Sequence, residues 1–246
     1  MKLRVINSNS TGNCYILVDS GGKSLMIECG VRMDKIKQAL NFDVANVCGC
    51  IISHEHNDHC KSVKDVAAAG IDIYASKGTL SYFNMDSHRL KTLLPMKVQE
   101  IGPFGVIPFS VKHDAREPFG FLVKHVEMGT MLFLTDTYYC EHTFQGLNNI
   151  LLEINFSKKI IDQKLESGEG TGFLRNRIFQ SHMELETAKD LLRANNLTQV
   201  NNIVLIHLSD KNSHAQEFQK EIQELTGKKV LIAEAGMEID FNKHPF

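Results

Sequence analysis

The chain has 246 residues, of which 43% are hydrophobic and 23% are charged, and its formal net charge is −2. This composition is ordinary for a globular protein and excludes a disordered or fibrous chain. The apolar runs are shorter than the roughly 18 residues of a membrane span, the opening residues MKLRVINSNS lack the apolar segment of a secretory signal, and the small net charge argues against a generally basic nucleic-acid-binding surface.

Short strands are predicted throughout the first half, because apolar and β-branched runs alternate with turn residues. These strands are Leu3–Ile6, Asn13–Asp19, Ser24–Glu28, Val47–Ser53, Ile71–Tyr74, Gln99–Ile101, Val106–His113, Phe119–His125 and Met131–Leu134. Two helices interrupt them, one near Met33–Leu40 and one from about His59 to Ala69, with Gly70 as a C-terminal stop.

The six cysteines include no CxxC pair, so they are expected to be reduced thiols in a cytoplasmic compartment. Cys48 and Cys50 alternate within an apolar strand. We therefore expect both thiols to lie on one face of that strand and to pack as small buried groups.

Strands and helices alternate in the second half. The predicted strands are Asn149–Ile154, Ile203–Ile206 and Lys229–Ala233, and the predicted helices are Glu184–Asn195 and Ser213–Thr226. Between them, residues 161–177 contain three glycines in five positions and predict a mobile loop. The whole pattern predicts a single α/β domain over residues 1–246, with two sheets flanked by helices.

The most informative segment is His54-Glu55-His56-Asn57-Asp58-His59, directly after a predicted buried strand. Imidazole nitrogens and carboxylate oxygens are preferred zinc ligands, and polar surface loops rarely place three histidines so close together. Alternating His54 and His56 can reach one cation, while Asp58 and His59 can reach a second cation beside it. The segment therefore predicts part of a metal centre.

Three further predicted strands also end near residues that can bind metal, namely His113, Asp136 and His207. A buried strand fixes the position of such a residue, and the following loop exposes its side chain. Each residue alone would be a weak signal. Together with the histidine-rich segment, they predict one centre assembled from several strand ends.

These residues, in this order, resemble the metal motif of the metallo-β-lactamase-fold hydrolase superfamily. The resemblance covers the whole chain and implies an αββα sandwich with two divalent cations, zinc or manganese, at one edge of the sheets. Asp136, where true β-lactamases carry Cys, favours the phosphodiesterase branch, in which it would bridge the two metals. The first metal would be completed by His54, His56 and His113, and the second by Asp58, His59 and His207.

Further segments are similar to the WalJ-like (YycJ-like) nucleases, a subgroup related to ribonuclease Z and to phage enzymes that degrade cyclic nucleotides. They include Ser10-Thr11-Gly12-Asn13, His113-Asp114-Ala115 and His207-Leu208-Ser209. The chain departs from this pattern at three places. Glu28 replaces an early Asp, Phe156 replaces the His of a Glu-x-Asn-His stretch, and Ser181 replaces the Gly before His182.

The resemblance also suggests roles for residues around the metals. Asp58 could orient the nucleophilic water as well as bind metal. His182 is a candidate proton donor or phosphate ligand, and a merely polar residue at a helix start is the alternative. Arg175 and Arg177, after the glycine-rich segment, could hold a phosphate by bidentate hydrogen bonds, unless they are ordinary surface charges.

We therefore expect a binuclear-metal phosphodiesterase that hydrolyses a nucleotide phosphodiester. The net charge and the lack of a Lys/Arg-rich arm favour a cyclic nucleotide over a long nucleic acid. The alternatives are a DNA or RNA exonuclease of the WalJ-like type, a thioester or lactone hydrolase, and a non-catalytic metal-binding module. We expect a cytoplasmic location, in the host cytoplasm if the chain is phage-encoded, with no membrane partner, and we leave a homodimer open.

Overall fold

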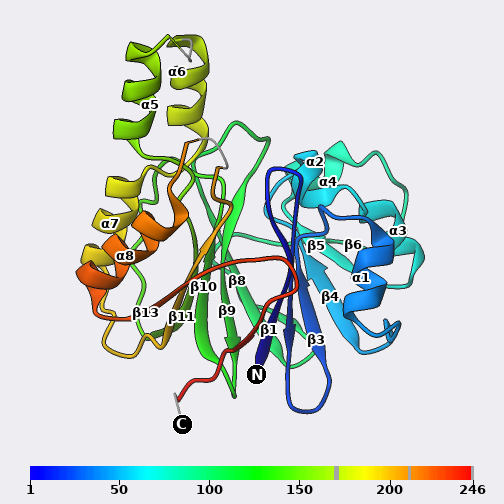
Figure 1. Cartoon of the computed structure of the whole chain (residues 1–246). Helices are drawn as coiled ribbons and strands as arrows, with labels where there is room; N and C mark the ends of the chain where they lie inside the picture. Colours follow the sequence, from blue (N-terminus) through cyan, green and yellow to red (C-terminus); the bar gives the residue numbers. More distant parts are fainter. Residues whose placement is uncertain (169–171, 210–211, 245–246) are drawn as a thin grey trace.

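Two seven-stranded sheets pack face to face in the computed structural model (Figure 1). The structure describes residues 1–168, 172–209 and 212–244. Helices cover the outer face of each sheet. The described chain therefore has the four layers of an αββα sandwich, and the predicted fold class is confirmed. None of the helices in these described ranges is long and apolar enough to cross a membrane.

The first sheet is built mostly from the first hundred residues. Its strand order is β14-β1-β2-β3-β4-β5-β6, antiparallel from β14 to β3 and parallel from β3 to β6. The bounds are β1 (Lys2–Asn9), β2 (Gly12–Val18), β3 (Ser24–Ile27), β4 (Val47–Ile51), β5 (Ile73–Ala75), β6 (Leu90–Thr92) and β14 (Glu238–Asp240).

The second sheet mirrors this arrangement. Its order is β13-β12-β11-β10-β9-β8-β7, antiparallel from β7 to β10 and parallel from β10 to β13. The bounds are β7 (Gln99–Ile101), β8 (Phe104–Ser110), β9 (Phe119–His125), β10 (Gly129–Leu134), β11 (Leu147–Glu153), β12 (Asn202–Ile206) and β13 (Lys229–Ile232). The parallel strands β3, β11 and β12 are buried along their whole length, which explains their apolar runs.

The central core lies between the two sheets, where Leu3 and Ile51 of the first sheet share one apolar cluster with Phe121 and Phe133 of the second. Two outer cores lie beneath the helices. The helices over the first sheet are α1 (Met33–Ala39), α2 (Asn57–Cys60), α3 (Val63–Ala68) and α4 (Lys77–Tyr82), and those over the second are α7 (Leu185–Ala194) and α8 (Ala215–Thr226) (Figure 1).

The predicted helix from His59 to Ala69 is in fact two short helices, α2 and α3. The break occurs at Ser62, which donates its backbone N–H to the carbonyl of Cys29, 3.0 Å away, and its hydroxyl to the carbonyl of Val31. These bonds replace the helical hydrogen bond of Ser62 and tie the segment to the loop that follows β3. Helix α2 thereby becomes a single turn that carries Asp58 and His59.

The prediction that Cys48 and Cys50 share one face was wrong. Cys50 is buried in the outer core, whereas Cys48 is half-buried and packs against the central core. The register between β3 and β4 shifts between Ser24 and Leu25, so β4 has one extra residue there. Such a bulge interrupts the two-residue alternation of side chains.

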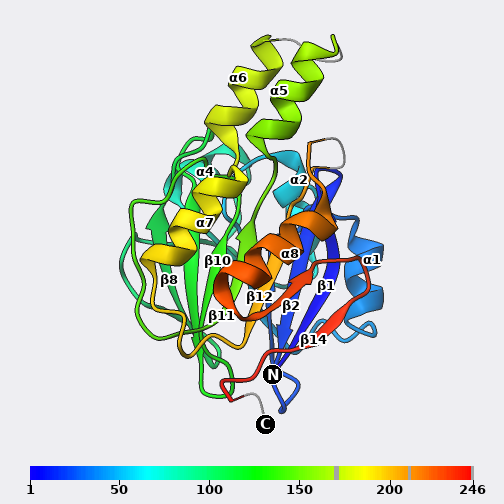
Figure 2. The same cartoon turned by 60° about the vertical axis from the view of Figure 1, so that its left-hand side comes forward.

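The predicted mobile loop at 161–177 was also wrong for the residues that the structure describes. They form most of two helices, α5 (Lys158–Glu166) and α6 (Gly172–Ser181), which project beyond the sheets as a hairpin (Figures 1 and 2). Residues 169–171 lie outside the described part of the chain. The glycine signal marks a helix end, because Gly168 follows α5 with φ of 79°.

Candidate metal centre

The carboxyl ends of β4, β8, β10 and β12 meet at one edge of the sandwich. His54 and His56 lie in the loop after β4, and α2 continues that loop with Asp58 and His59. The other sheet contributes one residue after each of three strands, namely His113, Asp136 and His207. All seven residues predicted from the sequence are therefore brought together across the boundary between the two sheets.

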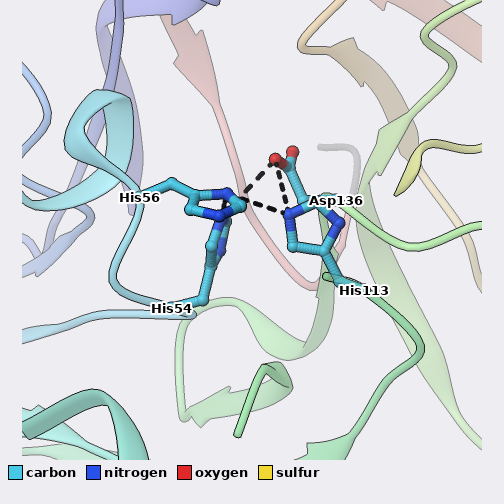
Figure 3. Close-up of side chains that lie close together, drawn as sticks. All are labelled: His54, His56, His113 and Asp136. Atoms are coloured by element: carbon cyan, nitrogen blue, oxygen red, sulfur yellow. Dashed lines mark hydrogen bonds and ion pairs between the residues drawn. The ribbon is translucent and has the colours of Figure 1, made fainter. Parts of the chain in front are cut away.

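The first group contains His54, His56, His113 and Asp136, whose metal-competent atoms all lie within 4.8 Å of one another (Figure 3). His56 Nδ1 lies 3.0 Å from His54 Nε2 and 3.1 Å from His113 Nε2. Asp136 Oδ2 lies 3.6 Å from both Nε2 atoms. Three imidazoles and one carboxylate facing a common point are a typical donor set for a divalent cation.

Hydrogen bonds behind these rings orient their free nitrogens toward the group. His113 Nδ1 donates to the carbonyl of Ser181 at 2.7 Å, so its Nε2 keeps a lone pair. His54 Nδ1 lies 2.9 Å from the Ser53 hydroxyl. Burial and the facing His59 ring lower the pKa of His54 well below its ordinary value, which favours the neutral ring that a metal requires.

The second group contains Asp58, His59 and His207. Asp58 Oδ2 lies 3.4 Å from Nε2 of each histidine, and Asp136 Oδ2 lies 3.4 Å from His59 Nε2. His207 Nε2 is buried and, apart from this approach of Asp58, has no hydrogen-bond partner among the residues that the structure describes. A buried nitrogen without a partner is costly in a protein, and a cation at this point would supply the missing interaction. The donor set thus fits a second divalent cation, and the Asp136 carboxylate of the first group lies beside it.

Negative charge accounts for the attraction of this second group for a cation. Burial alone would lower the pKa values of His59 and His207, but the Asp136 carboxylate raises both well above their ordinary value. The same carboxylate that stabilises a proton on these rings would stabilise a metal ion in its place, so metal binding and protonation compete.

Glu153, at the end of β11, is a buried residue of the site that sequence reasoning missed. Its Oε1 lies 3.1 Å from His207 Nδ1 and 2.7 Å from His182 Nδ1. Burial alone would raise its pKa, but the adjacent His182 holds the pKa below its ordinary value. The available signal was its position, because it ends a buried strand at the same edge as the other residues.

Glu28, which replaces the family's Asp, also lies behind the second group. It is fully buried, accepts a hydrogen bond from the Ser53 backbone N–H at 3.1 Å, and approaches His59 Nδ1 at 3.6 Å. A carboxylate behind a ligand histidine fixes the ring orientation and raises its basicity. The longer Glu side chain therefore lies within ion-pair distance of His59, although it makes no hydrogen bond to that ring.

An open cleft of about 480 Å³ lies over the two groups. His56, Asp58, His113, Asp136 and His207 contribute to its floor. The end of α6 forms part of its wall through Arg177, Ile178 and Ser181, followed by His182. The groups are thus accessible to a substrate, and α6 of the hairpin lines one side of the cleft. Figure 2 shows α5 and α6 projecting beyond the sheets.

The model of the Beta-lactamase superfamily domain matches residues 16–208, which span most of the chain. The chain belongs to the beta-lactamase superfamily. Exodeoxyribonuclease WalJ of Streptococcus pneumoniae serotype 2 is 27% identical over 98% of this chain and 92% of its own length. Exodeoxyribonuclease YycJ of Bacillus anthracis is 27% identical over 92% and 88%. The metallo-beta-lactamase fold protein YhfI of Bacillus subtilis, at 17% identity, superposes with a TM-score of 0.72 over 97% of this chain and 99% of that one.

As a member of this superfamily with a clustered His/Asp centre, the chain is a metal-dependent hydrolase. The two arginines predicted to bind phosphate differ in their surroundings. Arg177 lines the cleft. Arg175 is paired with Asp162 of α5 at 3.0 Å and stacks over Phe179 at 4.4 Å, and it is not among the residues that line the cleft. Arg175 therefore joins the two helices of the hairpin.

Proposed function

We propose that the protein is a metal-dependent exodeoxyribonuclease that removes nucleotides from a DNA end. The observation that carries this proposal is the pair of adjacent ligand groups beneath an open cleft, in which Asp136 of the first group lies 3.4 Å from His59 of the second. Its substrate is suggested by the two curated relatives matched over most of their length, both named exodeoxyribonucleases. They support the exonuclease alternative over the cyclic nucleotide that the sequence favoured.

The small net charge of the chain, which favoured a cyclic nucleotide over DNA, does not exclude a DNA end as substrate. Long duplex tracks need many phosphate contacts, but an enzyme that acts at a strand end contacts only a few phosphates. The cleft has room for a nucleotide or two, and it contains the one arginine of its described lining, Arg177. A net charge of −2 is compatible with such a small contact.

In this proposal, His54, His56, His113 and Asp136 hold one divalent cation, and Asp58, His59, His207 and the shared Asp136 hold another. Paired cations of this kind lower the pKa of water toward neutrality and neutralise the charge of a phosphoryl group during in-line displacement. Asp58, whose side chain is 24% exposed to the cleft, also orients the attacking water. Arg177 holds a non-bridging phosphate oxygen.

His182 provides the proton that the leaving oxygen needs. Its Nδ1 donates to Glu153 Oε1, which leaves Nε2 available toward the cleft. Burial alone would lower the pKa of His182, but the Glu153 carboxylate raises it above the ordinary value, which favours the protonated ring. Glu153 therefore positions and charges the proposed acid.

A substrate panel with manganese- or zinc-loaded protein tests the proposal. We expect degradation of linear single- and double-stranded DNA labelled at either end, and no degradation of circular single-stranded DNA, which has no end. The panel should include 3′,5′-cyclic mononucleotides, cyclic dinucleotides and RNA. Robust turnover of a cyclic nucleotide with no loss of DNA would refute the exonuclease and support the small substrate.

A further inference from the structure

Two exposed tyrosines follow Asp136 within three residues. Thr135, Asp136 and Thr137 are 2%, 3% and 0% exposed, whereas Tyr138 and Tyr139 are 41% and 53% exposed. Large aromatic side chains usually lose much of their surface on folding. The change from a fully buried strand end to two open rings is therefore abrupt, and it occurs directly beside the proposed catalytic centre.

The backbone that carries these rings is held in place. The Thr137 backbone N–H donates to Glu153 Oε2 at 3.3 Å, and the Thr137 hydroxyl accepts the backbone N–H of Lys112 at 3.0 Å. The Tyr138 N–H donates to the Lys112 carbonyl at 3.2 Å, and the Thr137 hydroxyl donates to the Tyr139 carbonyl at 2.7 Å. The tyrosines are thus presented by an anchored loop, which reduces the ordering entropy that binding would cost.

The cleft offers histidine rings and one arginine to a base, but none of the described residues that line it is Phe, Tyr or Trp, and the chain has no Trp. Stacking of a nucleobase on a Phe or Tyr ring would therefore come from outside the cleft. Tyr138 is two residues from Asp136, so their Cα atoms are at most about 7 Å apart. Among the exposed Phe and Tyr residues of the described chain, these two lie nearest in sequence to a proposed metal ligand.

We propose that Tyr138 and Tyr139 form a stacking platform for unpaired bases next to the scissile phosphodiester. The inference rests on the proposed nuclease function and adds a substrate property to it. Stacking on aromatic rings binds single-stranded nucleic acid without strong sequence preference, because every base has a flat face. The platform would make a single-stranded or frayed end the preferred substrate and tolerate all four bases.

The experiment compares two single-stranded oligonucleotides that differ only in the two nucleotides at the cleaved end, which are normal in one and abasic in the other. Both have the same scissile phosphodiester. For the wild type we expect kcat/KM to be about five- to hundredfold higher on the normal strand, the range of one stacked base. The loss on the abasic strand should appear mainly in KM.

The double variant Tyr138→Ala with Tyr139→Ala should reduce this ratio to near one, while Phe replacements at both positions should restore it, because they retain the ring. Phe42→Ala is the matched control, since Phe42 is 71% exposed and precedes β4 at the opposite edge of the sheet. The rate on the abasic strand, where no base can stack, reports whether the variants have damaged the proposed metal centre.

A normal-to-abasic ratio that stays at the wild-type value in the Ala variant would overturn the platform, since the bases would then be recognised elsewhere. A ratio of one in the wild type would overturn it as well. If the wild type degrades neither strand but still hydrolyses a chromogenic phosphodiester, the exonuclease proposal itself fails. This outcome is seen in the wild type alone, so it can be distinguished from failure of the platform, which is seen in the variants.

Discussion

Glu28, Asp136 and His207 adopt left-handed backbone conformations, with φ of 63°, 43° and 51°, although none of them is glycine. This conformation costs an L-residue roughly 1–2 kcal/mol. Glu28 and His207 directly follow the buried strands β3 and β12, and Asp136 lies two residues after the end of β10. The turn at each strand end redirects the side chain, and the buried hydrogen bonds around it maintain the strain.

Replacing Asp136 by Ala removes the carboxylate that both ligand groups share. We expect loss of at least one bound cation and of nearly all hydrolysis, because the remaining cations would repel each other without it. Elemental analysis, DNA degradation and circular dichroism measure metal, activity and fold. The shared role of Asp136 is contradicted if the variant hydrolyses its substrate at the wild-type rate.

The replacement His182→Ala removes the proposed proton donor. We expect kcat on DNA to fall by roughly 10²–10⁴-fold, the usual contribution of general acid catalysis. A p-nitrophenyl phosphodiester should lose much less, because its leaving group needs no proton, and metal content should be unchanged. Equal losses on both substrates would indicate a binding role for His182.

All seven proposed ligands could be predicted from the sequence, because they lie after recognisable apolar strands. The structure places them close together. Glu153 was missed for a physical reason. It lies at the end of β11 and its side chain faces two histidines that are distant in sequence. Glu153 and the two histidines become neighbours only through the order of β10, β11 and β12 in the sheet, and no local sequence motif indicates that order.

At the scale of elements, the same contrast holds. Long apolar strands such as β11 and β12 were predicted, whereas the short strands β6 and β14 and the helices α4, α5 and α6 were not. Strands of three residues give little periodic signal, so β5 and β7 were predicted while β6 and β14 were missed. The hairpin was hidden by the glycines between its helices.

The hairpin allows its two arginines to be tested against each other. Arg177→Ala should raise KM for DNA about 10- to 100-fold, the loss of a hydrogen bond to a charged phosphate. Arg175→Ala should leave KM nearly unchanged and increase hydrogen exchange in α5 and α6, because it removes the pair with Asp162 and the stacking on Phe179.

Arg193→Ala serves as the surface control for both arginine variants. Arg193 is paired with Asp190 on the exposed side of α7, at 2.7 Å. If Arg175→Ala raises KM as much as Arg177→Ala, both arginines bind substrate, as the sequence suggested.

At the scale of the whole molecule, the proposed ligands come from both sheets, so bound cations would link the two halves of the sandwich. Elemental analysis should find close to two divalent ions per chain after reconstitution. A ligand that binds only the folded state stabilises it by about 2.7 kcal/mol at one hundred times Kd. Chelation should therefore lower the Tm, and added zinc or manganese should restore it. A Tm that chelation leaves unchanged, or a single bound ion at saturation, would contradict the proposal of two cation sites that link the sheets.

Glu127 links the sheets at the opposite end. It lies between β9 and β10 of the second sheet, and its carboxylate accepts hydrogen bonds from the Met1 ammonium at 2.7 Å and from Ser20 of the first sheet. The bond from Met1 lowers the pKa of Glu127 to about 2. A lowered pKa means that this stabilisation is complete above the ordinary value near 4.5 and is lost as pH falls toward 2.

The variant Glu127→Gln should therefore be less stable than the wild type at pH 7, by about 1 kcal/mol at most because the group is partly solvated. The difference should shrink below pH 4 and vanish near pH 2. Urea unfolding across this pH range measures it. A difference that is independent of pH would show that the charge of Glu127 does not contribute.

The joining of distant segments also sets an order of events during synthesis. The backbone of His207 is bonded to Ser8, 199 positions earlier, and β14 pairs with β1 at the start of the chain. Contacts of such long range slow folding. At about 5–20 residues per second, a growing chain holds the first four ligands for on the order of ten seconds before His207 is made. The emerging polypeptide thus cannot complete the proposed metal centre until His207 has been synthesised, and hydrolysis that depends on this centre can begin only then.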